Sequence, residues 1–588
     1  MSPKETALSA RDQAWRRVSK PVSCLMNKFL QTCHIECDNT VLLYSHEKLN
    51  GTQGTLSMLA RTARVVSGCI VVFCLGASAP AWSFGFADVT KKAQALAQRP
   101  YKAPSAVPDF LTSLPYDRYQ SIRFKPEANL WRQPASADKK HFEVMMMPTG
   151  SVYRHSVTLN QVDLEGVKPL VFDRDHFTYP SSDLAKRVPA DLGYAGFRLT
   201  WPLQAASVVK SAERQGNQFL VFGGASYFRG VGADNGFGLT ARGLAIDTGL
   251  PSGEEFPAFT EFWLERPAAN AGTMTVYALL DSPSATGAYR FVITPGTATG
   301  IEVSAHLFAR SNIDQIGLAP LTSMFYYGKN TRQPAGEWRP QVHDSDGLLI
   351  QDEKSAEVTE WVWRPLLNPT SLRMNFFQVT NLKGFGLMQR DTRFDDFSDA
   401  EAHYEKRPSA WIDNISDWGS GEVVLVEIPT SSEGNDNIVA FWKPRQTIEQ
   451  GAELNFRYRL RFGEHTAFDG NIGRVVDTWV GAGRLNGAHP GESHRSLEGT
   501  WRVVVDFEGK TLNAANVPVV SEVGTSGNAE ILEHFVEYLP DQGIWRLSML
   551  VKPTPNKDTP LRARLLAGPN AVSETWLYQL PDLAQARE

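Results

Sequence analysis

Short runs of β-branched and aromatic residues, separated by Gly, Pro, Asn and Asp, recur along most of the chain. Runs of this kind at sandwich-like intervals are typical of β-strands. The pattern lacks a regular alternation of strands with helices, which argues against a doubly wound sheet or a (β/α)₈ barrel. We therefore predict a mainly β protein that begins with a large antiparallel β-sandwich. Its expected strands include residues 151–159, 218–222, 273–280, 289–294, 422–428 and 455–462.

A second strand-rich block follows a linker predicted from Gly463 to about Asp469. Six or so short strands in this block are typical of an immunoglobulin-like sandwich. They are expected at residues 501–507, 517–523, 529–538, 545–551, 562–566 and 576–580. The pattern thus predicts a large sandwich domain over 84–462 and a smaller immunoglobulin-like domain over 470–588. One amphipathic helix is expected earlier, at residues 87–97.

Residues 58–83 have the pattern of a secretory signal peptide. Two arginines precede an apolar core over 65–75, and small residues suited to a signal peptidase follow at 79–83. The core is too short for an ordinary membrane span, and an uncleaved anchor is the alternative interpretation. Residues 1–57 are polar and without clear periodicity. We interpret them as an uncertain extension, such as a misassigned start ahead of Met58.

Cysteine usage fits export of a protein without disulfides. All five cysteines precede residue 84, so the mature chain would hold no disulfide, no thiolate metal site and no cysteine nucleophile. No His/Asp cluster shows the spacing of metal ligands, and His343 beside Asp344 is more simply a hydrogen-bonded structural histidine. We expect neither a metal nor a cofactor.

The charge balance narrows the class of partner. The chain carries a net charge of −5, and residues 1–83 contribute a surplus of four positive charges, so the mature part carries −9. An acidic chain argues against a nucleic-acid partner and against adhesion to anionic lipid. After signal removal we expect no stable membrane insertion. Gly-x-Ser-x-Gly, His-Glu-x-x-His and phosphate-loop motifs are not found, and the glycines of 236–241 are interpreted as a turn.

Carboxylates, aromatic rings, arginines and asparagines are concentrated between residues 342 and 437. Aromatic rings stack on the apolar faces of sugars, and a pair of carboxylates can divide acid and base work at a glycosidic bond. Asp344 and Asp436 are the best candidate pair, because each lies in a loop-like segment, HDSDG and EGNDN. An Asx-turn or a helix cap is the alternative interpretation of each.

The order of several sequence blocks resembles the periplasmic glucan biosynthesis proteins of Gram-negative bacteria, the MdoG/OpgG and OpgD family. The similarity extends from about Phe84 to about Leu580. PSGEEFP at 251–257 favours the G branch, whereas Asp346 favours the D branch. The blocks are LGYAGFR, GASYFR, ARGLAIDT, YALLDS, APLTSMF, VHDSDG, WVWRP, GFGLMQRD, YEKRPSAW and EGNDN.

The resemblance implies a periplasmic protein that acts on linear β-1,2-glucan. In members that cleave this polymer, the general acid aligns with Asp436, the general base with Asp344, and Tyr404 with a tyrosine of the catalytic cleft. The family also implies an inverting route in which proton and water steps are relayed. The resemblance also implies the same arrangement of a large β-sandwich followed by a smaller immunoglobulin-like domain.

Other residues of these blocks are candidates for binding the polymer. Asp346, Glu433 and Asp391 are expected to bind hydroxyl groups or to raise a neighbour's pKa by like charge, and Asp391 could instead pair with Arg390 or Arg393. The candidate sugar platforms are Trp361, Trp363, Trp411 and Tyr227, for which a place in the core is the alternative. The candidate hydroxyl donors are Arg229, Arg242, Arg364 and Arg407.

Two functions from different classes fit these residues. One is a periplasmic glycoside hydrolase or transglycosylase that trims β-1,2-glucan during synthesis of osmoregulated periplasmic glucans. The other is a binding protein that receives the nascent glucan from the inner-membrane glucan synthase and presents it for branching or release. The same carboxylates would be catalytic in the first case and only ligands in the second.

The sequence makes a direct prediction about processing. The mature protein is expected to begin near Phe84, because the basic, apolar and small-residue regions follow one another up to Ser83. Amino-terminal sequencing of the exported protein measures this. A chain that stays in the membrane and retains residues 65–75 would contradict the assignment.

Overall fold

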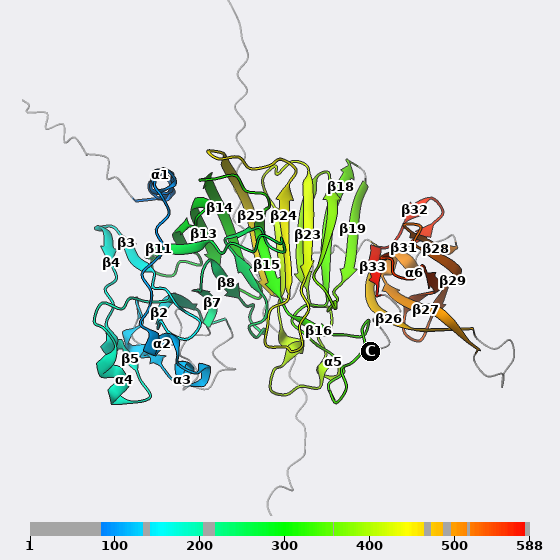
Figure 1. The fold of residues 1–588 in the computed structure, drawn as a ribbon, viewed down its shortest axis with the longest axis horizontal. Coiled ribbons are helices and arrows are strands. Elements are labelled where there is room, and N and C mark those ends of the chain that lie inside the picture. The colour runs from blue at the N-terminus through cyan, green and yellow to red at the C-terminus, as the bar shows by residue number, and fades with distance from the viewer. Residues whose placement is uncertain are drawn as a thin grey trace, which may run out of the picture. The chain divides into compact units, whose positions relative to one another are not determined.

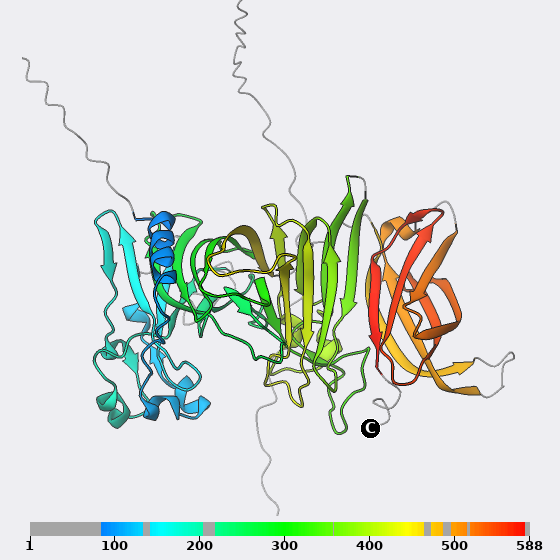
Figure 2. The ribbon, with the colours of Figure 1, turned by 45° about the horizontal axis from the view of Figure 1, so that its top comes forward.

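Two large, mainly antiparallel β-sheets dominate the computed structural model of the chain (Figures 1 and 2). The structure describes residues 84–132, 141–203, 218–356, 358–463, 472–485, 495–513 and 518–581. The 10-stranded sheet consists of β2 (Glu143–Met147), β6 (Gly196–Thr200), β7 (Gln218–Gly223), β8 (Tyr227–Gly230), β9 (Thr240–Arg242), β15 (Ile316–Ser323), β24 (Ile438–Pro444), β23 (Gly421–Glu427) and β20 (Arg373–Val379), with β10 (Leu244–Ile246) paired to β15.

The second sheet has 15 strands and extends into the carboxyl-terminal part of the chain. Its order is β28 (Val519–Thr525), β31 (Thr559–Ala567), β33 (Thr575–Leu580), β19 (Val358–Pro365), β18 (Gly347–Ser355), β21 (Leu382–Met388), β22 (Ser409–Asn414), β25 (Glu453–Gly463), β14 (Thr299–Ala309), β13 (Ala285–Thr294), β12 (Met274–Asp281), β11 (Ala258–Glu265), β3 (Thr158–Asp163) and β4 (Gly166–Pro169), with β32 (Asn570–Ala571) on β31.

Smaller elements complete the fold. A four-stranded sheet has the order β26 (Arg474–Leu485), β27 (Arg495–Glu508), β30 (Ile544–Pro553) and β29 (Ala529–Leu539), and the two-stranded sheets are β1 (Arg123–Phe124) with β5 (Phe177–Thr178) and β16 (Phe325–Tyr327) with β17 (Val342–His343). The helices are α1 (Phe86–Ala97), α2 (Asp109–Thr112), α3 (Tyr116–Gln120), α4 (Ser182–Arg187), α5 (Phe394–Phe397) and α6 (Lys510–Asn513), with 3₁₀ turns η1 (Pro126–Ala128), η2 (Arg174–His176) and η3 (Tyr404–Lys406). None of the helices in the described ranges is long and apolar enough to cross a bilayer.

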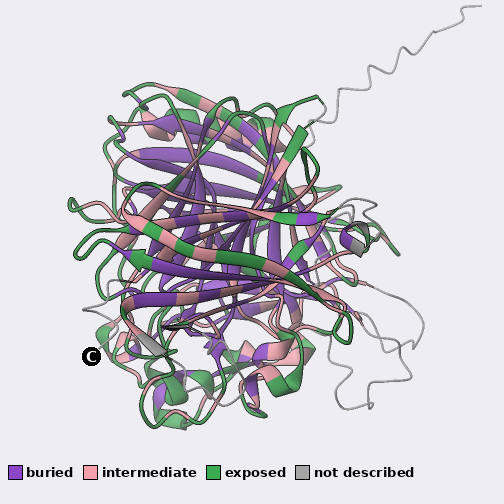
Figure 3. Cartoon of the chain, turned by 90° about the vertical axis from the view of Figure 1, so that its right-hand side faces the viewer, coloured by how far each residue is buried: buried purple, intermediate pink, exposed green. Residues whose placement is uncertain are grey.

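The two large sheets pack face to face over one aromatic core. Phe222 on β7 meets Phe291 on β13 with ring centroids 5.2 Å apart, and Phe228 on β8 meets the same ring at 5.4 Å. Both contacts are edge-to-face, the arrangement that aromatic quadrupoles favour. Figure 3 shows the interior strands buried and the connecting loops exposed. This packing gives the predicted β-sandwich, and the mainly β fold class is confirmed.

The carboxyl-terminal strands share a sheet and a core with the large sandwich. β33 pairs in parallel with β19, where Trp363 lies opposite Trp576. A second hydrophobic cluster joins β18, β19 and β22 to β27, β30 and β33. The division into domains at 84–462 and 470–588 stays a prediction, and residues 464–469 of the proposed linker lie outside the described residues, as do residues 1–83.

Most strands expected from the sequence are present, with ends no more than six residues from the predicted ones, and α1 lies at the expected helix. One expected strand, 151–159, is largely wrong. Ser151 has a φ of 49°, and Gly150 and Tyr153 form a tight bridge, so the chain turns there and β3 starts only at Thr158. A serine in the left-handed region is uncommon, and the hydrophobic pattern did not indicate it.

A buried ion pair joins the two large sheets. Arg364 on β19 is 2% exposed and lies 3.0 Å from the carboxylate of Glu427 on β23, which is 0% exposed. Glu427 also accepts hydrogen bonds from the Leu367 N–H at 2.8 Å and the Asn375 side chain at 3.3 Å. Both side chains of this pair are interior. Arg364 is therefore a structural residue, and its predicted role as a hydroxyl donor to a ligand is wrong.

We predict that Arg364→Ala lowers the free energy of unfolding by about 3–5 kcal/mol, because it leaves the Glu427 carboxylate buried without its cation. Chemical denaturation measures the change. The matched control is Arg459→Ala, which removes a 2.8 Å pair with Glu302 whose side chains are 45% and 50% exposed. An exposed pair contributes about 0–1 kcal/mol. Equal losses in the two variants would contradict the structural role of Arg364.

Candidate active site

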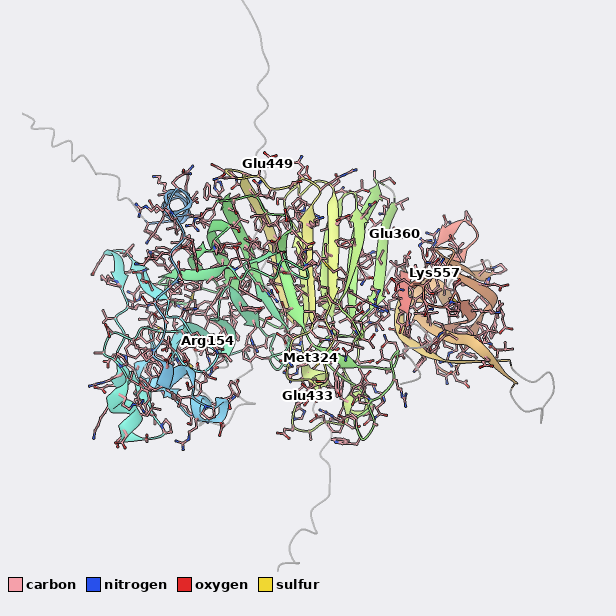
Figure 4. All side chains as sticks on the ribbon, viewed as in Figure 1. Arg154, Met324, Glu360, Glu433, Glu449 and Lys557 are labelled. Carbon is pink, nitrogen blue, oxygen red and sulfur yellow. The ribbon has the colours of Figure 1, made fainter. Side chains whose placement is uncertain are left out.

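The two candidate catalytic loops are anchored on one short segment, Ser323–Phe325, between β15 and β16. The N–H of Asp344 donates to the carbonyl of Met324 at 2.9 Å. The N–H of Asn437, the residue after Asp436, donates to the carbonyl of Ser323 at 3.0 Å. Figure 4 labels Met324 and Glu433 close together at the lower end of the central strands. Loops separated by about ninety residues in sequence thus meet at adjacent residues.

The side-chain amide of Asn437 fixes this junction. Its oxygen accepts the Phe325 N–H at 2.8 Å, and its nitrogen donates to the carbonyls of Phe325 and Ile428, each at 3.0 Å. Asn437 is 1% exposed, so these bonds do not compete with water. On the other loop, the hydroxyls of Ser323 and Ser345 are 2.8 Å apart. Both loops are consequently held in a defined position.

Asp344 is buried and faces a cation. The Nε of Arg407 lies 3.2 Å from Oδ1 of Asp344, yet among the described residues neither atom has an aligned hydrogen-bond partner. Burial, helped by the charges of Asp436 and Glu433 and opposed by Arg407 and Arg229, raises the pKa of Asp344 to about 6. A carboxyl that titrates near neutral pH is suited to proton transfer.

Asp436 is on the exposed side of its loop. The protein around its carboxyl nonetheless raises the pKa of Asp436 by desolvation, and the charges of Arg229 and Arg242 act in the opposite direction. The expected rise by partial burial is therefore present, whereas Glu433, the candidate neighbouring charge, is not among its causes. The charge of Glu433 acts instead on Asp344 and Tyr404.

Two of the predicted arginines come from neighbouring strands of the 10-stranded sheet. Arg229 is on β8 and Arg242 is on β9, which pairs with both β8 and β15. Arg242 is buried, donates from Nε to the hydroxyl of Thr322 at 2.8 Å and forms an ion pair with Glu254. Its guanidinium lies 4.7 Å from the ring centroid of Tyr227. The structure thus brings Arg229, Arg242 and Tyr227 to the side of Asp436.

Tyr404 and Arg407 reach the site from a turn. The 3₁₀ turn η3 begins after His403, which has a left-handed φ of 50°. The Tyr404 ring is buried against Met324, Tyr327, Val342 and Phe397. Burial raises the pKa of the Tyr404 phenol, and the charges of Glu433 and Asp344 add to the rise, so the phenol stays protonated. Arg407 lies 5.2 Å from this ring while it faces Asp344.

Arg339 is a residue of the site that the sequence did not indicate. It lies 2.7 Å from the carboxylate of Glu433 and 3.1 Å from that of Asp399, and it also pairs with Glu337 at 2.8 Å. Arg339 therefore links the loop of Asp436 to the segment that leads into Tyr404. The charged and aromatic string GEWRP, a few residues before Asp344, was the available signal.

Three of the predicted sugar platforms lie in the core. Trp361, Trp363 and Trp411 are between 1% and 6% exposed. Trp361 stacks on Trp411 with centroids 5.9 Å apart, and the Arg390 guanidinium covers Trp363 at 3.6 Å. Their ring faces are occupied by protein, so the prediction that they contact sugar is wrong. Tyr227 is the predicted platform that stays half-buried beside the site.

Asp346 and Asp391 belong to a polar cluster that also contains Lys329, His343 and Asp477. Asp391 pairs with Lys329 at 2.8 Å, a different cation from Arg390 and Arg393, which the sequence offered as the alternative to hydroxyl binding. Asp346 accepts the N–H groups of Arg390 and Asp391. Burial and the Asp391 charge raise the pKa of Asp346. His343 itself donates or accepts at Gln389, 3.0 Å away, and burial lowers its pKa to about 4, as expected of a structural histidine.

Within the described ranges, no group of three or more His, Cys, Asp or Glu side chains is arranged to hold a metal ion. The polar groups that meet at the junction are carboxylates, guanidinium groups and one phenol. Chemically, such a set can transfer protons and bind hydroxyl groups.

The fold and site define a mainly β protein with two loop-borne carboxylates over a rigid sandwich. A family model described as "Periplasmic glucan biosynthesis protein, MdoG" matches residues 84–580. The chain belongs to this family, and the resemblance seen in its sequence blocks is confirmed. It is thereby a protein of periplasmic glucan biosynthesis.

Curated relatives agree with the family. The chain is similar to "Glucans biosynthesis protein G" of Pseudomonas paraeruginosa, with 43% identity over 511 residues, covering 86% of this chain and 94% of the relative. It is 42% identical over 514 residues to the protein of that name from Ralstonia nicotianae, covering 87% and 98%. A solved galactosidase domain of an α-galactosidase–sucrose kinase is similar at 10% identity and a TM-score of 0.24, covering 57% of this chain and 42% of that chain.

The raised pKa of Asp344 has a consequence for stability. Between about pH 4 and pH 6 the folded protein holds a proton that the unfolded chain releases, so stability falls as pH rises through this window. We predict that Asp344→Asn raises the free energy of unfolding at pH 7 by on the order of 2–3 kcal/mol. The gain should vanish below pH 4, where both states of the wild type are protonated.

Denaturation at pH 7 and at pH 3.5 measures this difference. The matched control is Asp413→Asn, which removes a carboxylate paired with Arg461 at 3.0 Å on the half-buried rim of β22. That variant should show no gain at pH 7. A loss of stability in Asp344→Asn at pH 7 would contradict the assigned pKa of Asp344.

Proposed function

We propose that this protein acts in the synthesis of osmoregulated periplasmic glucans by cleaving linear β-1,2-glucan, as a glycoside hydrolase or transglycosylase. Asp436 is the general acid that protonates the leaving oxygen, and Asp344 is the general base that activates water or a sugar hydroxyl. The observation that carries the proposal is the shared anchor, because both loops form hydrogen bonds to adjacent residues, Ser323 and Met324. The pKa of each carboxyl is also raised.

The state of Asp344 favours catalysis over simple binding. A protein that only holds a neutral glucan gains nothing from a buried carboxyl whose pKa is raised, because an ionised, well-solvated carboxylate accepts sugar hydroxyls equally well. Here Oδ1 of Asp344 lies beside Arg407 without an aligned hydrogen bond. That is an arrangement in which a water molecule can be oriented and deprotonated.

Substrate would separate the two roles. Asp436 is exposed in the free protein, so a glucan chain laid over it would exclude water and raise the pKa of Asp436 further. Asp344 keeps its cation, Arg407, which favours the ionised form. Binding thus pushes Asp436 toward the protonated acid and leaves Asp344 as the base, the division that glycoside hydrolysis needs.

Tyr404 is suited to a relay. Its phenol stays protonated and lies within the charge influence of both Asp344 and Glu433. A hydroxyl of this kind can pass a proton between a sugar oxygen and a carboxyl, which agrees with the relayed, inverting route expected from the family. Arg339 positions Glu433 and so positions the loop that carries Asp436.

The location proposed for this activity is the periplasm. The signal pattern at 58–83 supports export, and the family to which the chain belongs is described as periplasmic. The proposed partner is β-1,2-glucan, with the inner-membrane glucan synthase as its source. Assignment to the G rather than the D branch is supported by the names of the relatives.

The second candidate function is a non-catalytic glucan-binding protein that presents the nascent polymer for branching or release. The half-buried Tyr227 beside Arg242 supports it, because a ring flanked by a guanidinium can hold a sugar without chemistry. Under this function Asp344 and Asp436 would contribute to affinity only.

We predict that Asp436→Asn lowers the rate of β-1,2-glucan cleavage by about 10²–10⁴-fold with little loss of affinity, because Asn keeps the shape but cannot deliver a proton. Asp344→Asn should lose a similar factor through failure to activate water. Reducing-end assays and calorimetric titration measure rate and affinity. Asp391→Asn, which lies in the Lys329 cluster, is the control and should have a milder effect on rate.

Near-normal turnover of Asp436→Asn at unchanged stability would end the catalytic interpretation. If the wild type binds the glucan without shortening it, and Asp436→Asn weakens that binding, the binding function replaces the enzymatic one.

A further inference from the structure

A cavity of about 420 Å³, with Tyr227 in its wall, lies where β7, β8 and β11 meet the loop around Arg154. This size is within the range of small-molecule sites, roughly 300–1,000 Å³. We propose that the cavity binds pyranose units of the same glucan chain at a distance from the bond that is cleaved. This inference rests on the proposed function, because it assigns a second contact region to the same substrate.

The lining has the chemistry of a sugar site. The lining includes the rings of Tyr153, Tyr227 and Phe256, the hydroxyls of Ser156 and Thr260, and the side chains of Arg154 and His155. No carboxylate is present among the residues that line it. Rings offer flat apolar faces, and hydroxyl groups both donate and accept hydrogen bonds. A neutral carbohydrate needs this combination.

Tyr227 links the cavity to the surroundings of the candidate acid. Tyr227 forms part of the cavity wall, and the charge of Asp436 acts on that phenol. The Arg242 guanidinium lies 4.7 Å from the Tyr227 ring and 5.7 Å from the Phe256 ring. A chain in contact with Asp436 can therefore extend over Tyr227 into the cavity.

The backbone keeps the cavity open. The turn after β7 passes through Gly224 at a φ of 80° and Ala225 at a φ of 40°. A Cβ at Gly223 would approach Met147 to 3.0 Å and Tyr153 to 3.3 Å, so a side chain there would press on the cavity wall. Left-handed backbone at a non-glycine residue is unfavourable, and such strain is often found at binding sites.

Phe256 gives the sharpest test, because it lines the cavity and is 54% exposed, so its removal should leave the fold intact. Phe256→Ala is expected to weaken binding of long linear β-1,2-glucan by between about twofold and about tenfold. The loss should shrink as the chain shortens toward the smallest oligosaccharide that the protein binds. Phe256→Tyr keeps the ring and should restore the affinity. Calorimetric titration with glucans of graded length measures these changes.

The matched control is Phe376→Ala on the edge strand β20, where the side chain is 48% exposed and remote from the cavity lining. It should bind every glucan as the wild type does. If Phe256→Ala binds long glucan as tightly as the wild type, or loses the same factor for every chain length, the cavity is not a distant contact region. If the wild type binds but does not cleave, the proposed function fails while the length dependence still decides the cavity.

Discussion

The site depends on one hydrogen-bonded junction, the pairing of the Asn437 amide with the main chain of Phe325. This amide satisfies the N–H and the carbonyl of Phe325 together and ties Ile428 to the same point. Together with the main-chain bond from the Asn437 N–H to the Ser323 carbonyl, it fixes the loop of Asp436 relative to the loop of Asp344. Sandwich strands on either side make the junction rigid, because β15 pairs with β24 through Ser323 and Ile438. Catalytic groups held on loops over a rigid scaffold are the usual arrangement in enzymes.

The same junction explains why the site is electrostatically unfavourable to the fold. Asp344, Asp436 and Glu433 are brought together, and Arg229, Arg242 and Arg407 compensate only in part. Several other interior charges of the described residues are directly paired, as Arg364 with Glu427 and Arg390 with Glu574 show. Incompletely compensated carboxylates are typical of a functional site, where stability is exchanged for reactivity.

The sequence predicted the strands, and the two acidic loops, from local signals. Alternating or continuous apolar runs identified β7, β12 and β25, and the strings HDSDG and EGNDN marked Asp344 and Asp436 as loop residues. The prediction that the tryptophans contact sugar failed for a tertiary reason. Trp361 and Trp363 are two residues apart on one face of β19, and only the tertiary structure shows that the carboxyl-terminal strands cover this face. Arg364 points to the other face, which is buried by the 10-stranded sheet. The partner of Asp391 could not be inferred either, since Lys329 is 62 residues away.

The central claim is that Asp436 and Asp344 act as an acid and base pair on a β-1,2-glucosidic bond with inversion. Following the anomeric proton signals by NMR, while the chain from residue 84 acts on linear β-1,2-glucan, tests this most directly. The account predicts shorter glucans whose new reducing ends first appear as the α-anomer and then mutarotate. A first product in the β configuration, or a glucan that stays intact over prolonged incubation with protein that binds it, would contradict the account.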